Sequence, residues 1–243
     1  MGSGNVVYVI AKAPQQRTCK TRLTPPLSSR QAVELARAFL LDAVEIVQQA
    51  GLDVRVMCRS AAERALLIGL LGEDASISVQ RGRGLGSALE SAFSEGLAAG
   101  YAAVGVFGAD SPTLDPRILR SAFAALEDGA DVALGPSADG GYYLLAARDV
   151  HPRLFQRMPW GTNRVAQLTL RNCESVGLTV SMLPTWYDVD DWAGLVELRE
   201  EIREDAPQIA RHTRRALGVA GLGAAPISRR PVAAAQLASR GTA

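Results

Sequence analysis

The chain has 243 residues, of which 48% are hydrophobic, and a formal net charge of +1 at pH 7. This length and apolar content suffice for one domain with a sizeable core, while the balanced charge argues against nucleic acid or an anionic membrane as a partner. The three scattered cysteines form no disulfide or zinc pattern, and neither a signal peptide nor a membrane span of ~20 apolar residues is evident, so we expect a cytoplasmic protein.

Short apolar runs alternate with amphipathic segments along the chain. The runs predicted as strands are residues 6–11, 53–58, 76–80, 102–108, 131–136, 142–147 and 178–183. The segments predicted as helices are residues 28–51, 61–72, 87–100, 161–177 and 190–202, with a further helix begun by Asp115-Pro116. This alternation predicts a single α/β domain with a mostly parallel sheet flanked by helices. Residues 218–243 lack periodicity and are predicted to form a disordered tail, which leaves 1–217 as the domain.

Four unusual loops each follow a predicted strand. They are KAPQQRTCKTRL (12–23), RGRGLG (81–86), GADSPTLD (108–115) and PSADGG (136–141). In open α/β sheets, ligands bind beyond the carboxyl ends of the strands. Parallel strands would therefore bring these loops together along one edge, where we expect a single cleft.

Two acidic positions are candidates for a metal site. Asp110 leaves an apolar strand in GADSP, and Asp190 lies in the acidic run YDVDD (187–191). Either carboxylate has a simpler structural interpretation, because Asp commonly caps turns and helices. However, Mg²⁺ typically takes one or two protein carboxylates and completes its shell with phosphate oxygens and water. The two loops therefore predict a site for Mg²⁺ (or Mn²⁺).

Only two lysines, Lys12 and Lys20, occur in the chain, and both lie in the first loop. A compact ammonium suits the binding of a phosphate chain, and Arg22 offers a bidentate grip on the same group. The alternative is a solvated loop in which the lysines have no such role. Their clustering favours a phosphate-binding loop.

Five motifs in this order resemble the DUF2064 family of GT-A-fold transferases. They are AKAP…KTRL, GADSPTL, ADGGYYLL, PWGTNRV and YDVDDWAGL, spread between Val6 and Ile202. Members are commonly described as nucleotide-diphospho-sugar transferases or arsenosugar-biosynthesis glycosyltransferases. The KTRL element is also similar to that of 2-phospho-lactate guanylyltransferases, and molybdenum-cofactor guanylyltransferases share the overall plan. The resemblance implies a GT-A-like fold.

The resemblance also implies roles for particular residues. The first loop would wrap a triphosphate, with Lys20 and Arg22 holding it, and Asp110 and Asp190 would hold the metal. The catalytic residues would accordingly be Lys20, Arg22 and Asp110. The implied nucleotide-binding residues are Ala11, Lys12, Lys20, Arg22, Gln80, Leu85 and Gly86, and the implied acceptor-binding residues are Asp139, Gly140, Gly141, Trp160 and Thr162.

The sequence departs from the family pattern at Arg17, where members usually have glycine. Glycine allows a close backbone approach to phosphate or a positive φ, which arginine tolerates poorly. The loop is therefore reshaped or Arg17 itself contacts phosphate. Trp160 also has a simpler interpretation as a core residue.

Three functions agree with these features. The first is a nucleotidylyltransferase that joins a nucleoside monophosphate to a small phosphorylated or phosphonate acceptor and releases pyrophosphate. The second is a glycosyltransferase with a nucleotide-diphospho-sugar donor, for which Asp139 is the candidate base. The third is a nucleotide-binding module without catalysis, supported only by Arg17. The nucleobase, the acceptor and the oligomeric state do not follow from the sequence.

Overall fold

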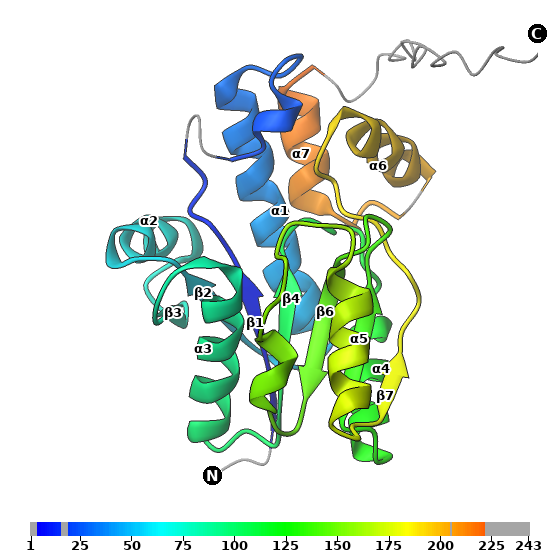
Figure 1. Ribbon diagram of the computed structural model, residues 1–243. Helices are drawn as coiled ribbons and strands as arrows, with labels where there is room; N and C mark the ends of the chain where they lie inside the picture. The colour runs from blue at the N-terminus through cyan, green and yellow to red at the C-terminus, as the bar shows by residue number, and fades with distance from the viewer. Residues whose placement is uncertain (1–3, 16–18, 205, 222–243) are drawn as a thin grey trace, which may run out of the picture.

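The computed structural model describes residues 4–15, 19–204 and 206–221. Within them, seven strands form one sheet in the order β3-β2-β1-β4-β6-β5-β7 (Figure 1). Strand β6 is antiparallel to both of its neighbours, and the other pairs are parallel. The strands are β1 (Asn5–Ile10), β2 (Asp53–Cys58), β3 (Ile77–Val79), β4 (Ala103–Gly108), β5 (Val132–Pro136), β6 (Tyr142–Ala147) and β7 (Val180–Met182).

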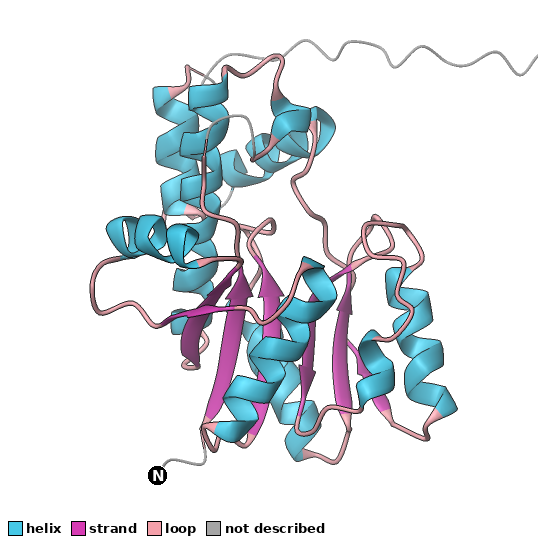
Figure 2. Cartoon of the chain, turned by 60° about the vertical axis from the view of Figure 1, so that its left-hand side comes forward, coloured by secondary structure: helices cyan, strands magenta, loops and turns pink. Residues whose placement is uncertain are grey.

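Helices cover both faces of the sheet (Figure 2). They are α1 (Ser29–Gln49), α2 (Ala61–Leu71), α3 (Gly84–Ala98), α4 (Pro116–Glu127), α5 (Val165–Ser175), α6 (Trp192–Glu204) and α7 (Arg211–Val219), with short 3-10 turns at Thr21–Leu23 and Pro152–Phe155. None of the helices in the described part of the chain has both the length and the apolar character to cross a bilayer. The predicted α/β architecture is confirmed.

Strand β1 shows how the sheet separates two cores. Val7 and Val9 face the core shared with α1, α2 and α4, whereas Val6 and Tyr8 face the core shared with α3 and α5. All four side chains are fully buried. Because successive side chains of a strand point to opposite faces, a strand covered on both faces is apolar throughout. This explains the unbroken apolar runs in the sequence.

Helix α1 begins and ends as its sequence predicts. The Ser28 hydroxyl accepts the Gln31 N–H at 3.3 Å, and the Gln31 side chain accepts the Ser28 N–H at 2.8 Å. This capping box satisfies two N–H groups that a helix start otherwise leaves unpaired. Just past the other end, Gly51 has φ +75°, a conformation that glycine adopts without steric cost.

A third apolar cluster lies beyond the carboxyl edge of the sheet. The first loop, α1, the YDVDD segment, α6 and α7 all contribute to it, and Figure 1 shows these helices gathered above the strands. Its buried members are Leu23, Leu27, Leu35, Phe39, Val189, Leu195, Leu198, Ile202, Ala210 and Leu217. The cluster therefore packs two of the motif segments, through Leu23 and Val189, against the same helices.

Three helices differ from the sequence prediction. Helix α5 begins at Val165, four residues after the predicted start at Gly161. Helix α3 begins at Gly84, before the predicted start at Ser87, so the end of RGRGLG forms its first turn. Helix α7 was not predicted, because it is short and polar and its N-cap residue, Ala210, supplies no side-chain cap. It extends to Val219, past the predicted domain boundary at 217. Residues 222–243 of the predicted tail lie outside the described residues.

Candidate active site

The strands that precede the motif loops all point the same way. β1, β4, β5 and β7 run in one direction, because β6 is antiparallel to both β4 and β5. The first loop, GADSP, SADGG and YDVDD therefore emerge at one edge of the sheet. This is the arrangement that the sequence predicts for a ligand site.

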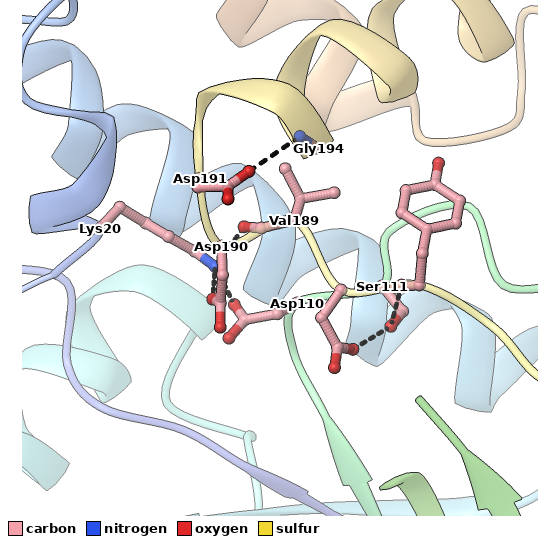
Figure 3. Close-up of polar contacts among 9 residues, drawn as sticks. Lys20, Asp110, Ser111, Val189, Asp190, Asp191 and Gly194 are labelled. Carbon is pink, nitrogen blue, oxygen red and sulfur yellow. Dashed lines mark hydrogen bonds and ion pairs between the residues drawn. The ribbon is translucent and has the colours of Figure 1, made fainter. Parts of the chain in front are cut away.

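Lys20 lies between the two predicted metal ligands (Figure 3). Its Nζ is 2.6 Å from Asp110 Oδ1 and 3.1 Å from Asp190 Oδ1, and it donates to the backbone oxygen of Val189 at 2.7 Å. The Lys20 side chain is 7% exposed, whereas those of Asp110 and Asp190 are 44% and 48% exposed. Three acceptors thus match the three protons of a buried ammonium.

The backbone at Lys20 is unusual. Lys20 has φ +45° and ψ +40°, in the left-handed region that a non-glycine residue adopts at an energetic cost. The Thr21–Leu23 turn follows directly, and the Leu23 N–H donates to the Lys20 carbonyl oxygen at 3.0 Å. Leu23 is fully buried, and the Phe39 ring lies 5.2 Å from Lys20 Nζ. Packing of the third cluster therefore holds the lysine in this conformation.

The two acidic loops are joined directly. The Val189 N–H donates to the Asp110 carbonyl oxygen at 2.8 Å. The Ser111 hydroxyl lies 2.8 Å from Asp188 Oδ1 and 3.0 Å from the Tyr187 carbonyl oxygen. These contacts fix one loop against the other. They bring the carboxylates of Asp110 and Asp190 close together without any bound ligand.

Asp191, rather than Asp190, caps the last predicted helix. Asp191 Oδ1 accepts the Gly194 N–H at 3.0 Å, and the Asp191 carbonyl oxygen accepts the Leu195 N–H at 3.0 Å (Figure 3). The helix cap that the simpler interpretation assigns to Asp190 is therefore formed by Asp191. The Asp190 carboxylate is directed to Lys20 instead.

The electrostatics of the site follow from burial and close charges. Burial alone would lower the pKa of Lys20, but the carboxylates of Asp110 and Asp190 outweigh it and raise this pKa above its usual value. Burial raises the pKa of Asp188, the charges of Asp110 and Asp139 raise it further, and the hydrogen bond from Ser111 acts in the opposite direction. Lys20 is thus charged at neutral pH.

Asp110 and Asp190 suit a divalent ion by their chemistry. Both offer carboxylate oxygens, and both are about half exposed. One oxygen of each lies within 3.1 Å of the position that Lys20 Nζ occupies. Mg²⁺ and Mn²⁺ prefer such oxygen ligands. The residues therefore fit the predicted metal, provided that the lysine leaves the position between them.

A second acidic cluster has a structural explanation. Asp42, Glu45 and His212 have potential ligand atoms within 4.8 Å of one another. Asp42, however, accepts the N–H groups of His212 and Thr213 at 3.0 and 2.9 Å and the Thr213 hydroxyl at 2.6 Å. It thereby caps α7 from α1. Glu45 in turn pairs with Arg211 at 2.7 Å.

The other predicted nucleotide residues of the first loop lie apart from the lysine–carboxylate group. Lys12 and Arg22 are exposed, and among the described residues neither forms an ion pair. Ala11 is buried and donates its N–H to the Met57 carbonyl oxygen at 3.0 Å, extending the β1–β2 pairing. Arg17, where the family usually has glycine, lies outside the described residues.

The glycine-rich turn before α3 meets the segment around Trp160. A Cβ at Gly86 would lie 2.8 Å from Trp160 Nε1, so glycine permits this contact. The Gln80 side-chain amide donates to the carbonyl oxygens of Gly82 and Gly84 at 3.1 and 3.2 Å and braces the turn. Leu85 is 42% exposed beside it. The structure thus joins part of the predicted base pocket to a predicted acceptor residue.

The SADGG loop packs on the start of α5. Gly140 has φ +89°, and a Cβ there would lie 2.1 Å from the Asn163 carbonyl oxygen. The Gly140 carbonyl oxygen accepts the Ala166 N–H at 3.0 Å, and Asp139 Oδ1 accepts the Gly141 N–H at 2.8 Å. Thr162 is exposed nearby in sequence, and its hydroxyl donates to the Pro159 carbonyl oxygen at 2.8 Å. Asp139 itself is exposed to solvent.

Comparison with protein families gives a match over half of the chain. The family model described as "Uncharacterized protein conserved in bacteria (DUF2064)" matches residues 40–162. The chain belongs to this family. None of the curated proteins matches the DUF2064 chain significantly.

Solved structures share the fold of this DUF2064 protein. A protein of Desulfovibrio desulfuricans G20, provisionally named a nucleotide-diphospho-sugar transferase, is 25% identical, with a TM-score of 0.82 over 92% of this chain and 99% of that one. A CMP:2-keto-3-deoxy-manno-octonic acid synthetase complexed with CTP is 12% identical, with a TM-score of 0.56 over 84% of this chain and 100% of that one. A nucleotidyl transferase of Methanothermobacter is 19% identical, with a TM-score of 0.54 over 84% and 100%. These similarities confirm the predicted fold and support a transferase.

Sequence reasoning missed three residues of the site in this DUF2064 protein. Asp188 and Ser111 join the acidic loops, and Phe39 lies against the ammonium of Lys20. A signal for Asp188 was present, because it lies in the same acidic run as Asp190, and a tight turn closed by the Asp190 N–H and the Asp188 carbonyl oxygen at 3.2 Å keeps the two residues close. Phe39 gave no signal, since it resembles any other apolar residue of an amphipathic helix.

Proposed function

We propose that this DUF2064 protein is a Mg²⁺- or Mn²⁺-dependent nucleotidylyltransferase. It joins a nucleoside monophosphate to a small phosphorylated or phosphonate acceptor and releases pyrophosphate. The observation that carries the proposal is the convergence of Lys20, Asp110 and Asp190 at the carboxyl edge of the sheet. A cationic group beside two carboxylates is suited to a triphosphate and its divalent ion.

The reaction requires positioning more than acid–base chemistry. An oxygen of the acceptor phosphate attacks the α-phosphorus of the nucleoside triphosphate, a new P–O bond forms, and the bond to the bridging oxygen of the β-phosphate breaks. The acceptor is already an anion at neutral pH, so no general base is needed. Accordingly, neither histidine of the chain lies in a motif loop.

The chain contributes charge and orientation to this step. Asp110 and Asp190 would hold the divalent ion, which neutralises phosphate charge when bound. Lys20 and Arg22 would bind the phosphate chain, and Lys12 would contact it nearer the end of β1. The turn at Gln80–Gly86 would receive the base, and Asp139, Gly140, Gly141, Trp160 and Thr162 would receive the acceptor. Most of these groups lie in loops that follow strands of one sheet, and binding of substrate by loops held on such a scaffold would supply the orientation that this step needs.

The deciding experiment is pyrophosphate release. The protein is incubated with each nucleoside triphosphate, MgCl₂ and a panel of sugar phosphates and phosphonates, and pyrophosphate is assayed. Acceptor-dependent release that is lost in Asp110→Asn supports the proposal. Absence of release across the panel, with nucleotide-sugars turned over instead, contradicts it.

Glycosyl transfer is the second candidate, because the Desulfovibrio protein is provisionally named a nucleotide-diphospho-sugar transferase. An acceptor hydroxyl would then need a base, and Asp139 is exposed at the acceptor loop with one oxygen occupied by the Gly141 N–H. The two candidates differ at this residue. Asp139→Asn should abolish glycosyl transfer by lowering kcat, whereas in nucleotidyl transfer it should change the acceptor KM and leave kcat largely intact.

A further inference from the structure

The ammonium of Lys20 lies where the carboxylates of Asp110 and Asp190 converge. It satisfies one oxygen of each at 2.6 and 3.1 Å, and the Val189 carbonyl oxygen takes its remaining proton at 2.7 Å. Among the described residues, Lys20 is the cation that forms ion pairs with these two carboxylates. Lys20 and a divalent ion bound to both oxygens would therefore compete for one position.

We propose that Lys20 is the resting counter-ion of the metal site. In the free protein its ammonium holds the two carboxylates together and blocks the position between them. When the phosphates of a nucleotide arrive, Lys20 transfers to them and frees Asp110 and Asp190. This inference rests on the proposed function and deepens it, because it makes the nucleotide a condition for tight metal binding.

The charges of the site favour this role. Asp110 and Asp190 lie close enough to share one partner, and two carboxylates so placed repel each other without a cation. Lys20 is 7% exposed, so its ammonium has little hydration of its own and depends on these protein acceptors. A metal ion that enters without nucleotide must displace a buried ammonium and deprive it of both carboxylate partners, which weakens metal binding.

The geometry also allows the transfer. The lysine side chain has four rotatable carbon–carbon bonds, and its charge has no fixed plane. Both carboxylates are about half exposed, so a phosphate chain has access to the site from solvent. The Phe39 ring lies beside the ammonium and accepts no hydrogen bond from it, so it does not tie the ammonium in place. Only the side chain needs to move.

Metal binding in the absence of nucleotide tests the proposal. Free Mn²⁺ is counted by its electron paramagnetic resonance signal during titration of the full chain, the Lys20→Met variant and the Arg37→Gln variant. Methionine keeps an apolar stem beside Phe39 and removes the charge. Arg37→Gln is the matched control, because Arg37 is a nearby cation that pairs with Glu34 rather than with the site.

Lys20→Met should bind Mn²⁺ at least about tenfold more tightly than wild type, because the competing cation is gone. Arg37→Gln should differ little from wild type, and adding Asp110→Asn to Lys20→Met should remove the gain. Circular dichroism checks that Lys20→Met is folded. Equal Mn²⁺ affinity of the wild-type protein and the folded variant would overturn the proposal.

The wild-type protein provides a second test that needs no variant. Its two lysines give two Nζ signals after labelling with ¹⁵N-lysine, and Lys20 is the one whose side chain is 7% exposed. Mg²⁺ alone at low millimolar concentration should leave the Lys20 signal unchanged. Mg²⁺ with a non-hydrolysable nucleoside triphosphate should shift it. A shift with low-millimolar Mg²⁺ alone, or no shift with both ligands bound, contradicts the proposal.

These results are separable from the proposed function. Tighter Mn²⁺ binding by Lys20→Met, together with no pyrophosphate release by the wild-type protein, would uphold the counter-ion and refute nucleotidyl transfer. Pyrophosphate release together with unchanged Mn²⁺ affinity in Lys20→Met would do the reverse.

Discussion

The Val189 N–H donates to the Asp110 carbonyl oxygen at 2.8 Å, and this hydrogen bond joins the loop after β4 to the segment after β7. The two residues flank the site from distant parts of the sequence. Because the bond is between backbone groups, substitution of either side chain leaves it in place. The backbones that carry the Asp110 and Asp190 side chains are thus held together by the fold before any ligand binds.

The first prediction concerns the two carboxylates. Asp110→Asn and Asp190→Asn should each lower kcat by about two orders of magnitude or more, because an amide neutralises a ligand of the divalent ion. Melting temperature should fall only slightly, since asparagine keeps an oxygen acceptor for Lys20 and both positions are about half exposed. Steady-state pyrophosphate release with circular dichroism measures both effects. Near-normal turnover of either variant at saturating Mg²⁺ would remove that residue from the site.

The second prediction concerns phosphate binding by Lys20. Lys20→Ala should weaken binding of a nucleoside triphosphate by ~1.5–3 kcal/mol, the range for a hydrogen bond to a charged group. It should weaken binding of the diphosphate less, because the missing charge faced the additional phosphate. Lys20→Arg should restore only part of the affinity, since guanidinium has a fixed plane. Calorimetric titration with both nucleotides is the measurement, and equal losses would favour glycosyl transfer.

Lys12 should behave differently from Lys20. It is exposed and lies just past β1, so Lys12→Ala should raise the nucleotide KM more than it lowers kcat. Initial rates over a range of nucleotide concentrations separate the two parameters. A fall in kcat with unchanged KM would mean that Lys12 acts in the transition state instead.

The third prediction concerns the link between Ser111 and Asp188. Ser111→Ala should destabilise the fold by ~1–3 kcal/mol, because it leaves the half-buried Asp188 carboxylate without this hydrogen bond. It should also weaken nucleotide-dependent Mn²⁺ binding, since the acidic loops lose one connection. Ser121→Ala, which removes an exposed helical hydroxyl, is the control. Equal melting temperatures for the two variants would contradict the predicted role.

The fourth prediction concerns the acceptor loop. Gly140→Ala should distort the loop, because the added Cβ would meet the Asn163 carbonyl oxygen at 2.1 Å and the backbone has φ +89°. We expect a higher KM for the acceptor and a largely unchanged KM for the nucleotide. Gly69→Ala is the control, since nothing lies within 4 Å of its new Cβ on α2. An unchanged acceptor KM in Gly140→Ala would show that the loop does not contact acceptor.

The fifth prediction concerns α7. Asp42→Ala should lower the free energy of unfolding by ~1–3 kcal/mol, because two N–H groups of α7 and the Thr213 hydroxyl lose their acceptor. Asp42→Asn keeps one acceptor oxygen and should lose less. Urea unfolding compares the two variants. A smaller loss in Asp42→Ala than in Asp42→Asn would argue against the cap.

The local pattern of apolar and capping residues in the sequence determined where the strands and most of the helices lie. Apolar runs such as β1 and caps such as Ser28 depend on neighbouring residues in the sequence, so they are legible without a structure. The sequence likewise predicted that the loops carrying Lys20, Asp110 and Asp190 meet, because polar loops that follow parallel strands converge at one edge of the sheet.

Only the tertiary structure decided how these residues meet. The position of Lys20 between two carboxylates depends on its left-handed backbone and on packing of Leu23 in the third cluster. Helix α7 depends on Asp42, a cap from another helix. Such contacts join residues far apart in the chain, so their geometry arises from packing of the whole domain and leaves no local pattern in the sequence.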